Sequence, residues 1–146
     1  YDIYHRPANI FVGTFIGSPP LNLFSCALRS EGATPFLVSP VFHLPLATAV
    51  ARHLSGSAEE LTLGVRPEFV ILGPKREESF PARVTLIESL GSRTLIFLEA
   101  RGQELRAVVQ GEATVREGET VHVTFALEHA FFFDRQGRRI ETRDSG

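Results

Sequence analysis

The chain has 146 residues, 43% of them hydrophobic, a formal net charge of −2 at pH 7 and one cysteine. This length suits one domain, the near-neutral charge argues against broad binding to nucleic acids or anionic membranes, and one cysteine excludes an internal disulfide and a multi-cysteine metal site. No apolar run reaches the roughly 18 residues of a membrane span, and no signal-peptide pattern opens the chain. The sequence also lacks methionine, so we expect it to be part of a longer protein.

The first 18 residues predict a helical segment. Pro7 can occupy the first turn of a helix, and Phe11 and Phe15 follow each other at i,i+4 spacing on an apolar face. Gly17 fits a C-terminal cap, and the pair Pro19-Pro20 cannot continue the helix. The apolar face is too large to stay bare, so we expect the rest of the chain or a second copy to cover it.

Beyond the first 22 residues the pattern changes to that of strands. Apolar and polar residues alternate in five segments, 61–66, 82–90, 93–100, 104–109 and 121–125. The pair Gly91-Ser92 joins two of them and predicts a tight hairpin. Short strands separated by turns at this spacing indicate a small barrel or sandwich.

One short helix is expected inside the strand-rich region. Pro45 can take its first position, Leu46, Val50 and Leu54 form an apolar stripe, and Gly56 follows its end. We expect the charged segment that follows the first predicted strand, residues 73–79, to be an exposed loop, and the tail after Glu141 to be frayed.

Four segments, taken together and in order, resemble a known family. They are Gly17-Ser18-Pro19-Pro20-Leu21-Asn22 with the residues before it, Leu63-Gly64-Val65-Arg66-Pro67-Glu68, the hairpin within 84–98, and Val115-Arg116-Glu117-Gly118-Glu119 with Phe131-Phe132-Phe133-Asp134 beyond it. The chain resembles the C-terminal regulatory domain of the ATP-binding subunits of sugar-type ABC importers, the group that includes maltose and glycerol-phosphate importers. Leu21, where the family commonly has Met, and Arg93, where Glu is frequent, depart from its pattern.

The resemblance implies a mainly β fold, an OB-like (TOBE- or MOP-like) barrel of the kind shared with molybdate-binding domains, with an N-terminal helical segment and one short inserted helix. It divides the chain into the helical end of a nucleotide-binding domain (1–18), an OB-like regulatory domain (19–142) and a frayed tail (143–146).

The resemblance also implies a function. The chain is expected to be the regulatory and dimerisation domain of an importer ATPase for sugars or sugar phosphates, cytoplasmic and peripheral to the inner membrane through the transporter complex. Expected partners are a second copy, transporter membrane subunits and regulatory proteins, with no nucleic acid and no direct membrane insertion. The alternative is a stand-alone OB-like module that binds a small ligand, an oxyanion or a sugar.

No catalytic, cofactor or metal site is expected in this chain. It contains no Gly-x-x-x-x-Gly-Lys-(Ser/Thr) phosphate loop, because Lys75 lacks the required glycines, so ATP and Mg²⁺ are implied only for the full-length protein. The five histidines do not fall at the spacing of metal ligands. We therefore expect the fragment itself not to be an enzyme.

The motif residues of the resemblance are interpreted mainly as structural: Gly17, Ser18, Pro19, Asn22, Gly64, Arg66, Pro67 and Glu68. For Arg66 and Glu68 a regulatory contact is the alternative. Side chains alternate faces along a strand, so the run Phe131-Phe132-Phe133 makes two faces apolar. Burial in the core or at an interface would cover these two apolar faces. The candidate interface residues are Phe11, Phe15, Phe131, Phe132 and Phe133.

Overall fold

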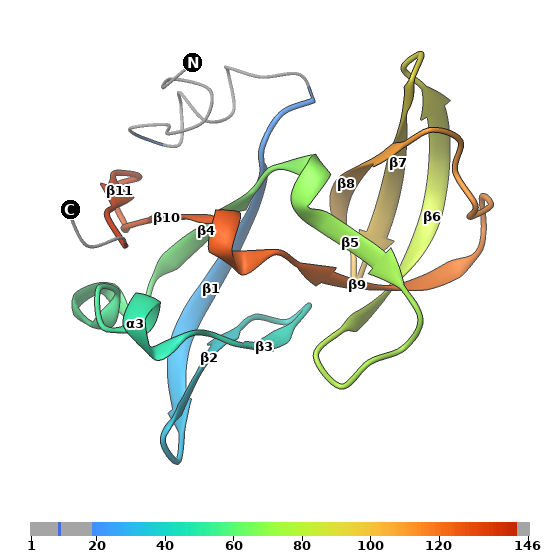
Figure 1. Cartoon of the computed structure of the whole chain (residues 1–146). Helices are drawn as coiled ribbons and strands as arrows, with labels where there is room; N and C mark the ends of the chain where they lie inside the picture. The colour runs from blue at the N-terminus through green and yellow to red at the C-terminus, as the bar shows by residue number, and fades with distance from the viewer. Residues whose placement is uncertain (1–8, 10–18, 143–146) are drawn as a thin grey trace.

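The computed structural model of the chain describes residue 9 and residues 19–142. These residues form two antiparallel sheets that lie side by side (Figure 1). The strand order is β11-β10-β4-β1-β2-β3 in one sheet and β5-β9-β6-β7-β8 in the other. The mainly β prediction is confirmed, although no strand pairing among the described residues closes either sheet into a barrel.

The six-stranded sheet is built from both ends of the described chain. Its strands are β1 (Asn22–Glu31), β2 (Thr34–Val38), β3 (His43–Pro45), β4 (Leu61–Val65), β10 (Phe131–Phe133) and β11 (Arg139–Ile140). The five-stranded sheet is continuous in sequence, with β5 (Val70–Gly73), β6 (Phe80–Ser89), β7 (Arg93–Ala100), β8 (Gln103–Gln110) and β9 (Thr120–Phe125). The chain therefore crosses from the first sheet to the second and back once.

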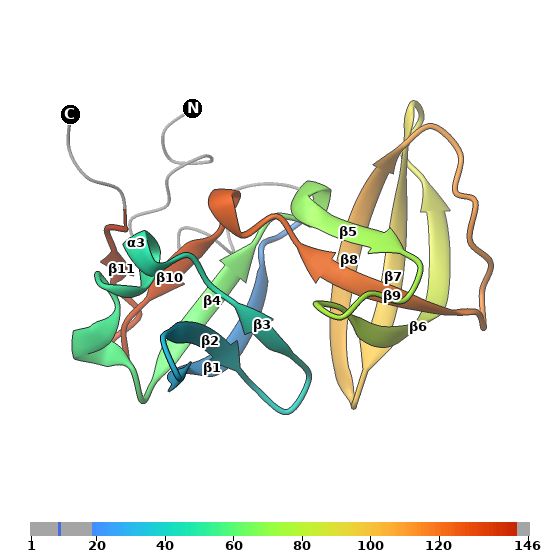
Figure 2. The ribbon, with the colours of Figure 1, turned by 60° about the horizontal axis from the view of Figure 1, so that its bottom comes forward.

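Each crossing contains one short 3-10 helix. The outward connection holds η2 (Pro67–Phe69), between β4 and β5, and the return connection holds η3 (Leu127–His129), between β9 and β10. Figure 2 shows both connections between the two sheets. The backbone N–H of Ala126 donates a hydrogen bond to the carbonyl of Phe69 at 3.0 Å, and this hydrogen bond joins the two connections.

One apolar core runs through both sheets. The Phe24 ring of β1 lies 5.2 Å from the Phe125 ring of β9 and 5.6 Å from the Phe42 ring, between centroids. Phe80 of β6 lies 5.5 Å from Phe125. Aromatic pairs at such distances add about 0.5–1.5 kcal/mol each beyond the area they bury. These rings therefore hold the two sheets against each other.

The predicted strands of the second half of the chain are observed close to their expected positions. β7 spans Arg93–Ala100 and is joined to β6 at Gly91, whose φ of 90° requires the freedom of glycine. The strands β1, β2, β3, β5, β10 and β11 were not predicted. The predicted exposed loop after β5 is present.

The inserted helix is shorter than predicted. Pro45 does not begin it but ends β3, opposite Phe36 of β2. β3 is the last strand of its sheet, and at an edge the missing N–H of proline interrupts no ladder. The helix, α3, spans only Thr48–Ala51, and a 3-10 turn η1 (Ser55–Ser57) follows it. Leu46 and Leu54 of the predicted stripe are nevertheless buried in the core.

Candidate functional site

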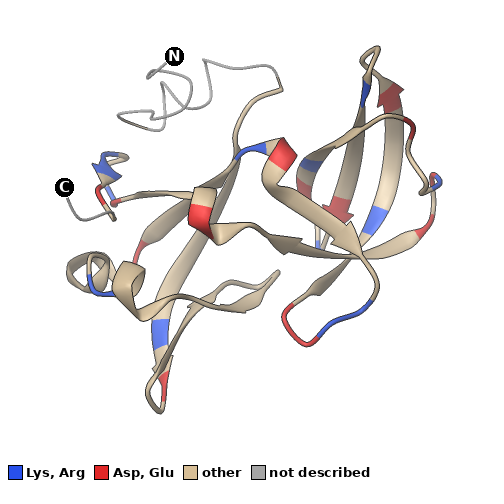
Figure 3. Cartoon of the chain, viewed as in Figure 1, with Lys and Arg blue, Asp and Glu red and all other residues tan. Residues whose placement is uncertain are grey.

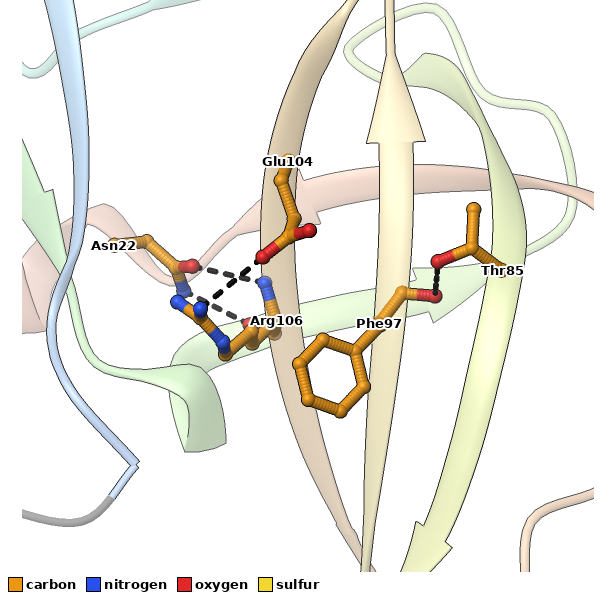
Figure 4. Close-up of polar contacts among 5 residues, drawn as sticks. All are labelled: Asn22, Thr85, Phe97, Glu104 and Arg106. Carbon is orange, nitrogen blue, oxygen red and sulfur yellow. Dashed lines mark hydrogen bonds and ion pairs between the residues drawn. The ribbon is translucent and has the colours of Figure 1, made fainter.

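Among the described residues, the most elaborate polar contacts join the two sheets at Asn22. Its side-chain oxygen accepts a hydrogen bond from the backbone N–H of Arg106 in β8 at 2.8 Å (Figure 4). Its side-chain nitrogen donates to the carbonyl oxygens of Arg106, at 2.8 Å, and of Val65, at 3.2 Å. The amide thus gives Arg106 both hydrogen bonds that a neighbouring strand would provide. Asn22, only 4% exposed, therefore covers part of the free edge of β8.

Arg106 also lies on the outer face of the five-stranded sheet. Its guanidinium carbon is 5.4 Å from the centroid of Phe97, the residue paired with it on β7. One of its terminal nitrogens lies 3.1 Å from a carboxylate oxygen of Glu104. On the far side of β7, the Thr85 hydroxyl donates to the carbonyl of Phe97 at 3.2 Å (Figure 4). Asn22 belongs to a motif predicted from the sequence, whereas none of these partners was predicted.

The Gly64 to Glu68 motif forms the outward connection between the sheets. A Cβ at Gly64 would lie 2.9 Å from Cδ2 of Leu21 and 3.0 Å from Cε2 of Phe133, so the backbone approaches these side chains closely. Pro67 is buried as the first residue of η2, whereas Glu68 is exposed. This arrangement is in keeping with the structural interpretation of the motif, which remains a prediction.

Arg66 of the same motif is 2% exposed. Its guanidinium carbon lies 5.9 Å from the centroid of Phe131, and that of Arg139 lies 5.3 Å from the same ring. A guanidinium within about 6 Å of an aromatic centroid is attracted by the ring. Arg66 is thus held inside the fold rather than displayed on its surface.

The three consecutive phenylalanines are all buried. Phe132 joins the core shared by both sheets, while Phe131 and Phe133 point to the other face of the six-stranded sheet and cluster with Leu21. Both faces of β10 are therefore apolar and covered within the chain. The interface role proposed for these residues stays a prediction.

The other predicted motif and interface residues are only partly described. Pro19 is half-buried just before β1. Gly17 and Ser18, and the predicted helix with Phe11 and Phe15, lie outside the described residues. So does the predicted boundary after residue 142, which also remains a prediction.

The described residues offer little that points to catalysis or metal binding. They contain no group of three or more His, Cys, Asp or Glu side chains that could hold a metal ion. Burial raises the pKa of the Cys26 thiol to about 12, despite a backbone hydrogen bond with Leu63 that lowers it. Thiolate is the nucleophilic form, so Cys26 is unreactive near neutral pH.

Charge and hydropathy are also unremarkable in the described part of the chain. Basic and acidic residues are interspersed over both sheets (Figure 3). No helix there has the length and apolar character needed to cross a bilayer.

Comparison with protein families places residues 63–133 in a known group. They match the model of the TOBE domain. The matched range runs from within β4 through the whole five-stranded sheet to the end of β10, so it contains both connections but not Asn22.

Comparison with curated proteins extends the similarity to nearly the whole chain. It is 36% identical over 145 residues to the sn-glycerol-3-phosphate import ATP-binding protein UgpC 2 of Agrobacterium fabrum, covering 97% of this chain and 37% of that protein. It is 34% identical over 155 residues to the xylose/arabinose import ATP-binding protein XacK of Haloferax volcanii, covering 98% of this chain and 38% of that protein. The chain thus spans little more than a third of the length of these relatives.

Among solved structures, the fold is similar to that of the cytoplasmic molybdate-binding protein ModG, in a form with molybdate bound. The TM-score is 0.57 at 17% sequence identity, and the match covers 76% of this chain and 94% of that one. At this identity the likeness concerns the fold alone. It supports the predicted OB-like class.

Proposed function

We propose that this chain is the regulatory domain of an ABC importer ATPase subunit, because its residues 63–133 match the TOBE domain and because it is related over nearly its whole length to import ATP-binding proteins. The observation that carries the proposal is the 97% coverage of the chain by the similarity to UgpC 2. We propose a sugar or a sugar phosphate as the transported solute, since the relatives named above import sn-glycerol-3-phosphate and xylose or arabinose.

In this proposal the chain does no chemistry itself. ATP and Mg²⁺ bind to the preceding part of the full-length subunit, and the TOBE domain pairs with that of a second subunit. Pairing keeps the two ATP-binding parts at high effective concentration, so their closure is nearly intramolecular. The membrane subunits of the importer are the further partners, which places the subunit at the cytoplasmic face of the membrane.

The arrangement of the sheets supports a domain that is joined to an ATP-binding part through one of its two sheets. The six-stranded sheet contains β1, the first strand after residue 18, and is therefore the sheet next to anything joined upstream. The five-stranded sheet begins and ends at the two connections, so it is joined to the six-stranded sheet at one end. Asn22 and the shared aromatic core join the two sheets.

The parent protein can be tested by sequencing the gene upstream of the codon for Tyr1. An in-frame Gly-x-x-x-x-Gly-Lys-(Ser/Thr) motif supports the proposal, because its backbone N–H groups and lysine hold nucleotide phosphates. A start codon immediately upstream, with no such motif, would overturn it.

Pairing is tested separately by sedimentation equilibrium of the chain over a range of micromolar concentrations. The proposal expects a reversible monomer–dimer equilibrium, with the dimer fraction rising with concentration. A monomer throughout the range would refute pairing by this domain while leaving its place in an importer subunit intact.

The alternative is a stand-alone module that binds a small oxyanion or a sugar. The likeness to ModG supports the fold that such modules use, and the ligand itself needs a direct measurement. Calorimetric titration of the chain with molybdate, sulfate, sugars and sugar phosphates separates the two functions. Saturable binding of any one favours the module, and no heat of binding favours the importer domain.

A further inference from the structure

The outer face of the hairpin formed by β6 and β7 carries exposed apolar side chains. Leu86 of β6 is 42% exposed and is paired with the half-buried Phe97 of β7. Leu90, which directly follows β6, is 40% exposed. The two neighbours of Phe97 along β7 are buried in the core, so Phe97 and its partner Leu86 point away from it. The five-stranded sheet thus has an apolar patch on the side that its core does not use.

A β-bulge in β6 places Leu86 on this side. The pairing of β6 with β7 shifts between Val84 and Leu86, so an extra residue stands between them. Val84 is fully buried, and after the shift Ile87 rather than Leu86 packs against the core. In a regular strand Leu86 would point inward, because it follows Val84 by two residues. The bulge therefore directs a leucine to the outside.

The apolar side continues across β7 and β8. Leu95, two residues before Phe97, is paired with Val108 of β8, and both are buried without belonging to the core shared by the two sheets. Phe97 lies beside Arg106 of β8 (Figure 4). In both views of the ribbon, β6 and β7 lie on the side of the molecule away from the six-stranded sheet (Figures 1 and 2). The six-stranded sheet therefore does not cover the hairpin.

Two opposite charges border the apolar side chains. Glu88 of β6 is exposed and is paired with Leu95, and Arg93 begins β7 on the same face, two residues before Leu95. Leu90 lies opposite Arg93, to whose carbonyl its backbone N–H donates a hydrogen bond at 2.8 Å. Neither charged side chain makes a hydrogen bond or an ion pair in the described part of the chain. Both are therefore available to a partner.

This combination of side chains is complementary to itself. In a two-fold symmetric interface, when residue i of one copy contacts residue j of the other, j also contacts i. One acid and one base on the same face thus form two ion pairs between two copies, on either side of an apolar centre. An apolar centre with a polar rim is the usual composition of a protein interface. The pattern favours a second copy of the chain over a partner of a single charge sign.

The size of the face fits a reversible contact. Three strands about 4.8 Å apart, each with about eight residues that rise about 3.3 Å, present roughly 400 Å². Two copies bury roughly 800 Å² in total through such a face, below the area of about 1,200–2,000 Å² in stable interfaces. We therefore expect the dissociation constant to lie in the high micromolar range.

We propose that two copies of the chain pair through this face, with Leu86, Leu90 and Phe97 at its centre and Glu88 of each copy beside Arg93 of the other. The proposal rests on the pairing proposed above and names the surface through which it occurs. That surface, defined by these five residues, is called the pairing face below.

Charge reversal tests the ion pairs of the pairing face. Glu88→Arg and Arg93→Glu each bring like charges together in a pair of identical copies, so sedimentation equilibrium should show a dissociation constant raised at least about fivefold. An equimolar mixture of the two variants restores both ion pairs, one between the introduced side chains and one between the unchanged ones, and should associate like the unchanged chain. Glu77→Arg, at an exposed acid before the opposite end of β6, is the matched control and should have no effect.

The outcomes separate the pairing face from pairing itself. If the unchanged chain dimerises and both reversals leave the dimer intact, this surface is wrong while pairing stands. The same holds if the mixture associates no better than either variant alone. A chain that stays monomeric into the high micromolar range would overturn pairing and this surface together, and would leave the place of the chain in an importer subunit intact.

A matched pair of apolar variants tests the centre of the pairing face. Leu86→Ser and Ile71→Ser each remove a large side chain of nearly equal exposure, 42% and 40%. Only Leu86 lies on the pairing face, because Ile71 belongs to β5, at the other end of the strand order. We expect Leu86→Ser to weaken dimerisation about tenfold, because both copies lose an apolar contact, and Ile71→Ser to leave it unchanged. Circular dichroism checks that both variants fold, and equal effects on dimerisation would contradict the proposal.

Discussion

Asn22 shows how one side chain can take the place of a strand. The edge of β8 presents the backbone N–H and C=O of Arg106, and the Asn22 amide has a donor and an acceptor in the geometry to satisfy both. A buried backbone group left without a partner costs about 1–3 kcal/mol. An acceptor-only or apolar residue at this position would leave at least one of these groups unsatisfied.

Replacing Asn22 therefore tests the junction. Asn22→Ala removes all three hydrogen bonds and is expected to lower the free energy of unfolding by about 2–3 kcal/mol. Gln103→Ala, which removes a single bond from Nε2 to the Leu23 carbonyl, should cost about 1 kcal/mol. Urea denaturation of both variants measures the difference. Equal losses would mean that the three Asn22 hydrogen bonds together stabilise the fold no more than the single, partly buried Gln103 bond does.

Cys26 supplies a pH-dependent prediction. Burial raises its pKa from 9.0 to about 12, so the folded chain holds the thiol proton that the unfolded chain releases. Its stabilising effect is therefore complete below pH 9 and is lost as the pH rises from 9 to 12, by up to about 1.4 kcal/mol per pH unit. Chemical denaturation at pH 8 to 10.5 should show a steeper loss for the wild type than for Cys26→Ala. Parallel pH profiles would rule out this linkage.

At the scale of elements, the two connections determine how the sheets meet. η2 and η3 lie together through the Ala126 to Phe69 hydrogen bond and through stacking of Phe69 on His129, with centroids 4.2 Å apart. Immediately before η2, the absence of a side chain at Gly64 lets β4 lie against Leu21 and Phe133. The position of the outward connection thus depends on that close approach.

Gly64→Ala tests this dependence. The added methyl would lie 2.9 Å from Cδ2 of Leu21 and 3.0 Å from Cε2 of Phe133, and both side chains are buried, so we expect a loss of about 1–2 kcal/mol of stability. Gly56→Ala is the matched control, because nothing lies within 4 Å of its Cβ position. That variant should be neutral or slightly stabilising. Thermal denaturation would refute the packing argument if both changes had the same effect.

The strands in which apolar and polar residues alternate were predictable, because one face of each strand is buried and the other is exposed to solvent. β9 and the first half of β6 show this period clearly, and the resemblance of the Gly64 motif correctly indicated the fold class. β1 and β10 escaped prediction for different reasons. β1 ends in exposed polar residues, and β10 is apolar on both faces, so neither shows the simple alternation of a half-buried strand.

The candidate site was predictable only in part. The family resemblance identified Asn22 and the Gly64 to Glu68 segment as special. Nothing in the spacing connected Asn22 to Arg106, which is 84 residues away.

At the scale of the whole molecule, we expect the two sheets to unfold together, because they share one apolar core. Phe24, from the six-stranded sheet, packs between rings that include Phe125 of the five-stranded sheet. The polar junction at Asn22 and the paired connections reinforce the contact. Neither sheet could separate without exposing these rings to water.

Calorimetry tests this cooperativity. We expect a single thermal transition whose calorimetric enthalpy equals the van't Hoff enthalpy, because a unit of this size with one core unfolds in two states. Phe24→Ala should lower stability by about 3–5 kcal/mol and, by removing ring contacts between the sheets, lower the van't Hoff enthalpy below the calorimetric value. Phe36→Ala, at a half-buried ring stacked on His43 within the six-stranded sheet, should destabilise while keeping the two enthalpies equal. Two resolved transitions in the unmodified chain would show instead that each sheet folds on its own core.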